Sequence, residues 1–571
     1  MPYSLNCLFI NIHQNEIFSE RLVRAVIWDI ALQIFLAVLL VFIIQIDVIH
    51  PLSWIASTFE DIVSWKMGLN VILLGLVSFF QAYIYGKYYM TPVPKYFTRF
   101  SMFLNIFTTQ NIIFTVLYAL NGYFTLILYS SLAKSNYVLK KMCEKSDGQC
   151  LNEQSLFLQL GGMWMGLFHF LSAHIFNKTI LTFPHIYQDK FQQMKLVIAN
   201  VISTGFQKSM KPVGYFCIFY YFWGNKPRRV VSDVYSVYLE DPPLDSLINI
   251  LKSGIWIGLW FYASLFFISV NAMRAVFNII LTEPMKFPIE SDKNLTLSSA
   301  LGQRSQFTGF LGAHDLRTLG MKDLSRRLQI FTLSQPGGHP RNWNAILENS
   351  LTIIKEFNKE LEAINCDNNV VGVNVSKRNI FNESPKSYIA YSGTLRNMAL
   401  SPQALDLKNI NENKEENSFI ITIKKEFNNF LQRLCQKPGI HYFFGELTDT
   451  KLKFILLQAQ PVMWTCEGLA HIVAVSLKED KYGVVQNDLP LVVSALISLK
   501  QNLEKLSKPG LVPRKQILND CFTMKTKTAV LSSVKRSIYK IVITFSKYIH
   551  EIPLDPDVQI AIQPFLVCKE P

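Results

Sequence analysis

Long apolar runs separated by short polar stretches dominate the first half of the chain. A helix needs about 20 mostly apolar residues to cross a hydrocarbon core of about 30 Å. Five runs meet this length, at residues 26–46, 68–86, 112–132, 156–176 and 254–277. The pattern therefore predicts five membrane-spanning helices within a membrane domain at residues 21–284.

A further apolar run at residues 212–224 is too short for an ordinary span. Lys208 and Lys211 lie on one side of its apolar core, and Lys226 follows it. At this length the run fits a short or tilted span, a re-entrant segment or an interfacial helix.

Basic residues beside the spans predict the orientation, because cytoplasmic flanks carry an excess of Lys and Arg. Arg21 and Arg24 precede the first span, and Arg274, Lys286 and Lys293 cluster around the end of the last. Both ends are then cytoplasmic, which requires an even number of spans. We therefore expect six spans, with 212–224 as the fifth and residues 1–20 as a cytoplasmic tail.

This topology also makes a prediction about glycosylation. Four N-x-Ser/Thr sequences begin at Asn177, Asn294, Asn374 and Asn382. All four fall on the cytoplasmic side in the six-span arrangement, so none is expected to carry a glycan.

The second half has the charge density of a water-soluble domain and the periodicity of helices. Only 20 of the 56 Lys and Arg residues precede Pro284. Apolar positions recur at helical spacing from Trp343 to Ile364, after Asn342 as the expected N-cap. Similar periods occur at 418–435, 461–477, 489–506 and 528–549.

Residues 365–417 are rich in Asn, Lys, Ser and Glu, which predicts a flexible linker or insertion. It separates a helical segment at 285–364 from a helical domain at 418–571. The predicted fold class is all-α: a polytopic helical membrane domain of about six spans, followed by a helical cytoplasmic domain with a flexible insertion.

One C-terminal segment, at residues 528–552, is strongly amphipathic. Its apolar positions fall at spacings of three and four and are Val530, Val534, Ile538, Ile541, Val542, Phe545, Ile549 and Ile552. We favour a surface helix whose stripe faces the domain core. The alternative is a helix that lies on an anionic membrane.

Composition supports a membrane protein rather than an ordinary cytosolic enzyme. Charged residues make up 17% of the 571 residues, against about 25% in soluble proteins. The net charge of +14 favours contact with anionic lipid or with acidic faces of partner proteins. Cys143 and Cys150 frame a short loop and are either free thiols or, if the loop is luminal, a disulfide.

No sequence pattern of a catalytic, cofactor or metal site occurs. The nucleophile elbow, the phosphate-binding loop and the zinc-binding helix motif are all absent. We expect no catalytic residue, no cofactor, no metal, no direct nucleic-acid contact and no small-molecule substrate.

Two alternatives to a structural role follow from ionisable residues in or near the spans. A transporter or channel with a cytosolic regulatory domain predicts a hydrated cavity formed with Asp29, His169 or His174. A membrane-embedded acyltransferase requires an acidic partner for His174 or His185, and none is near in sequence.

Glycine pairs four residues apart lie in two of the spans. They are Gly162 with Gly166, and Gly254 with Gly258. Such pairs clear a flat patch that lets another helix backbone approach closely, and we expect packing within the chain rather than dimerisation.

The segment Phe331–Trp343 has the sequence FTLSQPGGHPRNW, and 476–486 has the sequence SLKEDKYGVVQ. Both closely resemble the nuclear-division-cycle family of transmembrane nucleoporins, as does the layout of six spans followed by a helical half with a variable insertion. By this resemblance, two sets of residues determine the fold or bind a partner. They are Ser334, Gln335, Pro336, Gly337, Gly338, His339, Pro340, Asn342 and Trp343 in the first motif, and Glu479, Asp480, Tyr482 and Gly483 in the second.

The resemblance implies a structural protein of the nuclear envelope at the pore membrane, with both termini on the cytoplasmic or pore side. Members of this family help to insert and hold nuclear pore complexes. The implied partners are scaffold nucleoporins, including the WD-repeat nucleoporin Aladin and an inner-ring nucleoporin with an RNA-recognition-like fold. No catalytic residues are implied.

Overall fold

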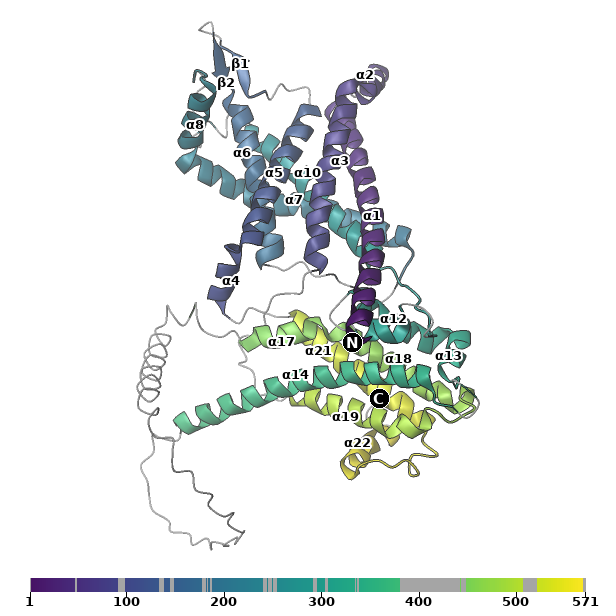
Figure 1. Ribbon diagram of the computed structural model, residues 1–571. Coiled ribbons are helices and arrows are strands. Elements are labelled where there is room, and N and C mark those ends of the chain that lie inside the picture. The colour runs from purple at the N-terminus through teal and green to yellow at the C-terminus, as the bar shows by residue number, and fades with distance from the viewer. Residues whose placement is uncertain are drawn as a thin grey trace, which may run out of the picture. The chain divides into compact units, whose positions relative to one another are not determined.

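The five long apolar runs form helices long enough and apolar enough to cross a membrane. They extend over Glu16–Ile44, Trp65–Gly86, Thr109–Leu132, Glu153–Ala173 and Ile255–Leu281. The computed structural model describes residues 2–46, 49–90, 98–132, 138–143, 148–176, 181, 183–184, 187–239, 244, 249, 254–290, 295–302, 307–333, 335, 338–379, 442, 448–506 and 521–567. The predicted all-α fold class is confirmed (Figure 1).

The chain divides into two compact units, which we describe separately. The N-terminal unit contains residues Met1–Pro94 and Leu104–Asn349, and the C-terminal unit contains Lys95–Phe103 and Ser350–Pro571. The two units share α4 (Arg99–Ile106). The other elements before residue 341 belong to the N-terminal unit and are α1 (Pro2–Ile44), α2 (Pro51–Val63), α3 (Trp65–Met90), α5 (Thr109–Leu132), β1 (Lys140–Met142), β2 (Gln149–Leu151), α6 (Glu153–Phe170), the π-helical turn η1 (Leu171–Phe176), α7 (Lys190–Trp223), α8 (Asn225–Tyr235), α10 (Ile255–Leu281), α11 (Leu297–Leu301), α12 (Phe307–Lys322) and α13 (Leu324–Ile330).

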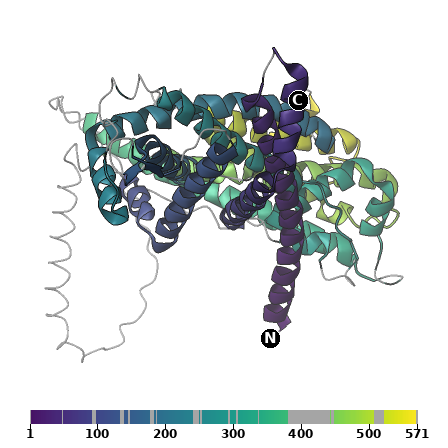
Figure 2. The ribbon, with the colours of Figure 1, turned by 90° about the horizontal axis from the view of Figure 1, so that it is seen from above.

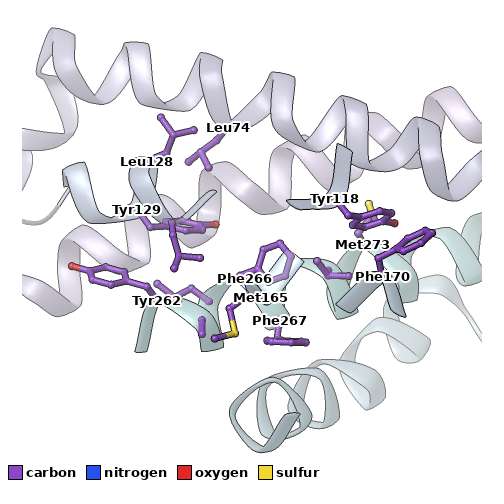
Figure 3. Packing of buried hydrophobic residues seen from close by; sticks show 14 of the residues in the cluster. Leu74, Tyr118, Leu128, Tyr129, Met165, Phe170, Tyr262, Phe266, Phe267 and Met273 are labelled. Carbon is purple, nitrogen blue, oxygen red and sulfur yellow. The ribbon is translucent and has the colours of Figure 1, made fainter. Parts of the chain in front are cut away.

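The long helices of the N-terminal unit form a closed bundle. Helix α1, unbroken and dark purple in Figure 2, packs on α3, α3 on α5, α5 on α6, α6 on α7 and α7 on α10, and α10 returns to α1. Helix α10 is the central one, since 72% of its most apolar window is buried against 28% for α1. Figure 3 shows the interior, where Tyr118, Phe170 and Met273 of three different helices meet.

Helix α7 joins the two ends of this bundle. It begins beside the end of α10, where Lys190 Nζ lies 2.7 Å from a carboxylate oxygen of Glu283. It ends beside the start of α6, where Tyr220 Oη donates to Glu153 at 3.4 Å. Its 34 residues correspond to about 51 Å of helix.

The interpretation of 212–224 as a short separate element is therefore wrong. These residues form the last third of α7, and Pro212 lies inside the helix with its carbonyl accepting from Trp164 Nε1 at 3.0 Å. Lys208 and Lys211 interrupt the apolar pattern of α7. For this reason only the final turns of the helix are visible in the sequence as a continuous apolar run.

The C-terminal unit is also helical. Helix α14 (Arg341–Asn379) begins in the N-terminal unit and continues into the C-terminal unit. The other elements of the unit are α17 (Thr448–Leu457), α18 (Ala459–Glu479), the short 3₁₀ turn η2 (Gln486–Asp488), α19 (Leu489–Lys505), α21 (Cys521–Thr544) and α22 (Pro556–Leu566). The predicted helices at 461–477, 489–506 and 528–549 correspond to α18, α19 and α21, whereas 418–435 lies outside the described residues.

Two predicted boundaries near α14 differ from the structure. The helix already begins at Arg341, so Asn342 lies in its first turn rather than before it, and its side-chain amide donates to the Gln329 carbonyl at 3.1 Å. The helix continues to Asn379, so the first residues of the predicted insertion at 365–417 are helical. The rest of that insertion lies outside the described residues.

The amphipathic stripe of α21 faces the core of the C-terminal unit. Val530, Val534, Ile538, Ile541, Val542 and Phe545 are at most 4% exposed, because α21 packs against α18 and α19. The helix ends at Thr544, so the predicted helix at 528–552 is too long, and Ile549 and Ile552 lie beyond it and are half-buried. A stripe buried in this way cannot also lie on a membrane, so the favoured interpretation is confirmed.

Candidate functional site

The first sequence motif is the connection between α13 and α14. The Gln335 carbonyl accepts a hydrogen bond from Gly338 N at 2.8 Å. Ser334, Pro336 and Gly337 lie outside the described residues. Gln335 and His339 are exposed, so the connection presents their side chains to the surroundings.

Large buried side chains fix both ends of this connection. Phe331 is 3% exposed and Trp343 is fully buried in the first turn of α14. The motif thus combines residues that determine the fold at its ends with exposed polar residues between them. Pro340 precedes α14 and accepts from Asn344 N at 3.0 Å, as the residue before a helix does.

The second motif forms the loop between α18 and α19. The two carboxylate oxygens of Asp480 accept from the backbone N–H groups of Tyr482 and Val485, each at 3.0 Å. Gly483 has a φ of +67°, a backbone conformation that side chains disfavour. Tyr482 is 65% exposed on this ordered loop. Asp480 and Gly483 therefore shape the loop, and Tyr482 is the side chain that it displays.

An ion cluster after the last span was not predicted from the sequence. Arg326 donates to both carboxylate oxygens of Asp315, at 2.9 and 2.7 Å, and to the Phe287 carbonyl at 2.6 Å. Asp315 also accepts from Phe287 N at 2.9 Å. Asp315 is almost fully buried and Arg326 is partly buried, and the pair ties the segment that follows α10 to α12 and α13. No local pattern reveals it, because its members are brought together only by tertiary packing.

A second cluster joins α1 to the end of α10. Arg21 donates to the carbonyls of Leu281 and Glu283, each at 2.7 Å, and the Glu283 carboxylate lies 3.9 Å from Arg24. The sequence identified Arg21 and Arg24 only as topology signals. In the structure they also fasten the first and last spans at one end of the bundle, which we call the basic end.

The opposite end of the bundle carries the hairpin of β1 and β2, and we call it the hairpin end. Cys143 and Cys150 form a disulfide across this antiparallel hairpin. The backbone of Cys150 pairs with that of Tyr238, which follows α8. The question that the sequence left open is thus answered in favour of the disulfide.

A buried ion pair supports the hairpin end. Glu153 Oε2 lies 3.2 Å from Arg228 Nε, and the other carboxylate oxygen accepts from Leu244 N at 2.8 Å. Glu153 starts α6, and Arg228 lies in α8. The two loops that precede α6 and α10 are therefore held together at the same end.

The first glycine pair lets α5 and α6 approach within backbone contact. A methyl group on Gly166 would overlap the carbonyl oxygen of Tyr118, and one on Gly162 would press on Gly122. Gly122 of α5 was not singled out in the sequence because it has no glycine partner four residues away. The packing lies within the chain.

The second glycine pair behaves differently. Gly254 precedes α10 with a φ of +62°, and no atom lies within 4 Å of the place where a Cβ of Gly258 would be. The expectation that this pair brings two helices together is therefore wrong; Gly254 serves the turn into α10.

Ionisable residues within the spans are enclosed by packing. His169 Nε2 lies 3.1 Å from Tyr85 Oη and is surrounded by the rings of Tyr118, Phe266 and Phe267. Asp29 is fully buried, and the side chain of His174 lies outside the described residues. Neither His169 nor Asp29 lines the groove between α7 and α10, so this groove gives no support to the transporter alternative.

Titratable groups outside the spans include two with clear shifts. Burial, with the nearby Arg317 charge, lowers the pKa of His314 in α12 to about 4. Burial raises the pKa of the Cys466 thiol in α18, which keeps it protonated and unreactive. Among the described residues, no group of three or more His, Cys, Asp or Glu side chains is placed to hold a metal ion.

Comparison with known proteins gives a consistent result along the whole chain. The family model described as nucleoporin protein Ndc1-Nup matches residues 16–563. Nucleoporin NDC1 of Mus musculus is 24% identical over 97% of this chain and 97% of its own length, and that of Homo sapiens gives the same values. Nucleoporin Ndc1 of Drosophila melanogaster is 25% identical over 96% of this chain and 97% of its own length.

Proposed function

Because the chain belongs to the nucleoporin Ndc1-Nup family, we propose that it anchors nuclear pore complexes in the nuclear envelope and supports their assembly. As a member of this family it is a membrane protein of the nuclear pore and a structural component, not an enzyme. The observation that carries the proposal is similarity over nearly the full length, which includes both the bundle and the C-terminal unit.

In this proposal the membrane is crossed six times. Helices α6 and α10 both start at the hairpin end, so the chain must return between them, and α7 makes that return. With α7 as the fifth crossing, the number is even and both termini lie on the cytoplasmic or pore side. The disulfide then lies in the oxidising lumen, where such bonds persist.

The C-terminal unit recruits scaffold nucleoporins in this proposal. The named candidates are the WD-repeat nucleoporin Aladin and the inner-ring nucleoporin with an RNA-recognition-like fold. Tyr482, a large exposed aromatic side chain on a loop held by Asp480, has the character of a partner contact. Gln335 and His339 are exposed on the first motif and are further candidates.

The anchor role is tested by the location of a C-terminally tagged chain in cells. With the plasma membrane selectively permeabilised, we expect a punctate nuclear rim and an accessible tag. A reticular or plasma-membrane distribution would contradict the anchor role. A rim signal with a protected tag would contradict the six crossings and leave the anchor role standing.

The crossing by α7 is tested with an engineered glycan acceptor. Val234→Asn creates the sequence Asn-Tyr-Ser on α8, at a position that is 72% exposed. We expect this site to be glycosylated in the lumen, while the natural sequence at Asn294 stays unmodified. An unmodified Asn at 234, or a glycan at Asn294, would overturn the proposed topology.

Partner recruitment is tested by affinity capture of the full chain from nuclear envelope extracts. We expect Tyr482→Ala to reduce the recovery of Aladin or the inner-ring nucleoporin while the chain still reaches the nuclear rim. Tyr548→Ala is the matched control, because Tyr548 is also exposed but lies outside both motifs. Equal recovery with the two variants would argue against the second motif as the partner contact.

A further inference from the structure

A groove between α7 and α10 contains polar groups that the anchor role does not use. It has a volume of about 550 Å³ and extends along both helices toward the basic end of the bundle. The side chains that line it from α7 include Gln193, Asn200, Thr204 and Lys208. Those from α10 include Asn271, Arg274 and Asn278.

Two cations face this groove without a counter-charge. Among the described residues, no carboxylate forms an ion pair with Lys208 or Arg274, and no carboxylate lines the groove. Both positive charges line the same groove. Placing like charges together beside apolar surroundings is unfavourable unless an anion or water compensates them.

A third polar group in the groove, the side-chain amide of Asn271, also favours a bound anion. The side-chain nitrogen of Asn271 is buried and has no hydrogen-bond partner in the described part of the chain. Asn271 lies one turn before Arg274 on α10, so both side chains lie on the same face of the helix. The groove thus combines two cationic donors with an amide donor, a set that suits a phosphate group.

The groove also has the apolar wall that a lipid requires. Leu196, Val197 and Ile279 line it beside the polar groups. Leu196 is 67% exposed, so part of this apolar wall is open to the surroundings. A water-soluble anion would gain nothing from these side chains, whereas acyl chains would cover them.

The position of Arg274 fits the level of lipid headgroups. It lies seven residues before Leu281, so it is about 10 Å from the basic end of α10. Lys208 lies further from the basic end, and its four-carbon stem can extend along the groove toward that end. Basic pockets between membrane helices on the cytoplasmic side are a known way to bind anionic headgroups.

We propose that the groove between α7 and α10 binds an anionic phospholipid, with its phosphate between Lys208, Arg274 and Asn271 and its acyl chains along the apolar wall of α7. The proposal rests on α7 lying in the membrane, as the proposed topology requires. A lipid held there would fill the gap between the two helices and join them at the basic end.

The test measures binding of phosphatidic acid to the purified full chain in detergent, by native mass spectrometry and by thermal stabilisation. We expect phosphatidic acid to bind and phosphatidylcholine to bind much more weakly. The double variant Lys208→Gln, Arg274→Gln should lose roughly tenfold or more in affinity for phosphatidic acid. The matched control is Lys195→Gln, Lys211→Gln, which removes the same charge from α7 outside the groove and should bind as the natural chain does.

Two further variants test whether a loss of binding comes from a loss of folding. Lys208→Gln alone changes an exposed side chain and should lower the affinity severalfold without unfolding the chain. The pair Lys208→Arg, Arg274→Lys keeps both charges and should bind phosphatidic acid nearly normally. Natural affinity in the double Gln variant, or equal losses in the control pair, would overturn the proposal.

Competition separates a lipid from a soluble anion. Millimolar inorganic phosphate should leave lipid binding unchanged, because it cannot cover the apolar wall. Displacement by inorganic phosphate, with equal thermal stabilisation by it, would overturn the lipid assignment and identify a soluble anion. A chain that reaches the nuclear rim but does not bind phosphatidic acid would refute only the groove, while binding by a chain absent from the rim would refute only the anchor role.

Discussion

The two units of the molecule place their apolar side chains on opposite faces of their helices. In the bundle, α1 and α3 expose large apolar residues such as Ile27, Trp28 and Phe80, and bury polar ones such as Asn70 and Gln81. In the C-terminal unit, α21 turns its apolar stripe inward and leaves Lys and Arg outside.

The difference teaches that the surrounding solvent, and not helix formation itself, decides which residues each unit exposes. In lipid, apolar side chains gain nothing from burial, so the bundle depends on close backbone approach and buried polar contacts. In water, the C-terminal unit depends on removal of apolar area from solvent. The same substitution should therefore have different effects in the two units.

The largest expected effect comes from filling the backbone contact inside the bundle. Gly166→Leu places a side chain against the Tyr118 carbonyl, where neither backbone can move away. We expect a loss of about 3 kcal/mol or more in stability, seen as a collapse of the thermal transition in detergent and loss of rim localisation. Gly258→Leu adds the same side chain where no atom lies within 4 Å, and it should have little effect.

An introduced charge on an outward-facing residue should destabilise the bundle much more than the C-terminal unit. Leu76→Asp replaces an exposed apolar residue on α3 and should cost roughly 2 to 3 kcal/mol, because lipid surrounds that face. Leu491→Asp replaces a residue of similar exposure in the first turn of α19, where water and the helix dipole accept the charge. We expect reduced insertion and abundance only for the first variant, and equal behaviour would contradict the comparison.

Replacing a glycine should be more destabilising in the loop between α18 and α19 than on the side of α7 where no atoms surround the glycine. Gly483→Ala forces a side chain into the left-handed region and should destabilise the loop by about 1 kcal/mol or somewhat more. Hydrogen exchange over 476–486 should rise several-fold. Gly214→Ala, in α7 with open space around it, should leave exchange unchanged or slightly slower.

The smallest effect concerns acid sensitivity of α12 in the N-terminal unit. The folded pKa of His314 is about 4, below the unfolded value of about 6.5, so the unfolded chain takes up the proton first. Stability is fully present above pH 6.5 and is lost as the pH falls toward 4, by about 1 kcal/mol at pH 5.5. The melting temperature should fall between pH 7.5 and 5.5, and His314→Gln should remove that part of the fall; an unchanged pH dependence would refute this origin.

The spans could be predicted from the sequence because membrane thickness fixes the length of an apolar run. Helix α7 could not, since Lys208 and Lys211 divide its pattern and its length depends on packing against α10 and α6. The repeating stripe of α21 was sufficient to predict both the helix and its buried face.

The candidate site was predictable only in part. The resemblance singled out Asp480, Tyr482 and Gly483, which form an ordered loop in the structure, but it did not distinguish the residues that shape the loop from the one that is exposed. They gave no sign of Asp315 with Arg326 or of Glu153 with Arg228, since these pairs form between elements that local sequence does not connect. The groove at Lys208 and Arg274 is likewise a product of packing between α7 and α10.

Glu153 has a consequence for how the chain is made. Its backbone partner at Leu244 lies 91 residues further along the chain, and its ionic partner Arg228 also comes later. At roughly 5 to 20 residues per second, synthesis reaches Leu244 about 5 to 20 s after Glu153 emerges. The carboxylate that starts α6 cannot form these contacts during that interval, so the hairpin end cannot reach its final packing until the segment after α8 has been translated. The order of synthesis therefore limits when the hairpin end can form, and we expect a substitution of Arg228 to slow biogenesis of the chain.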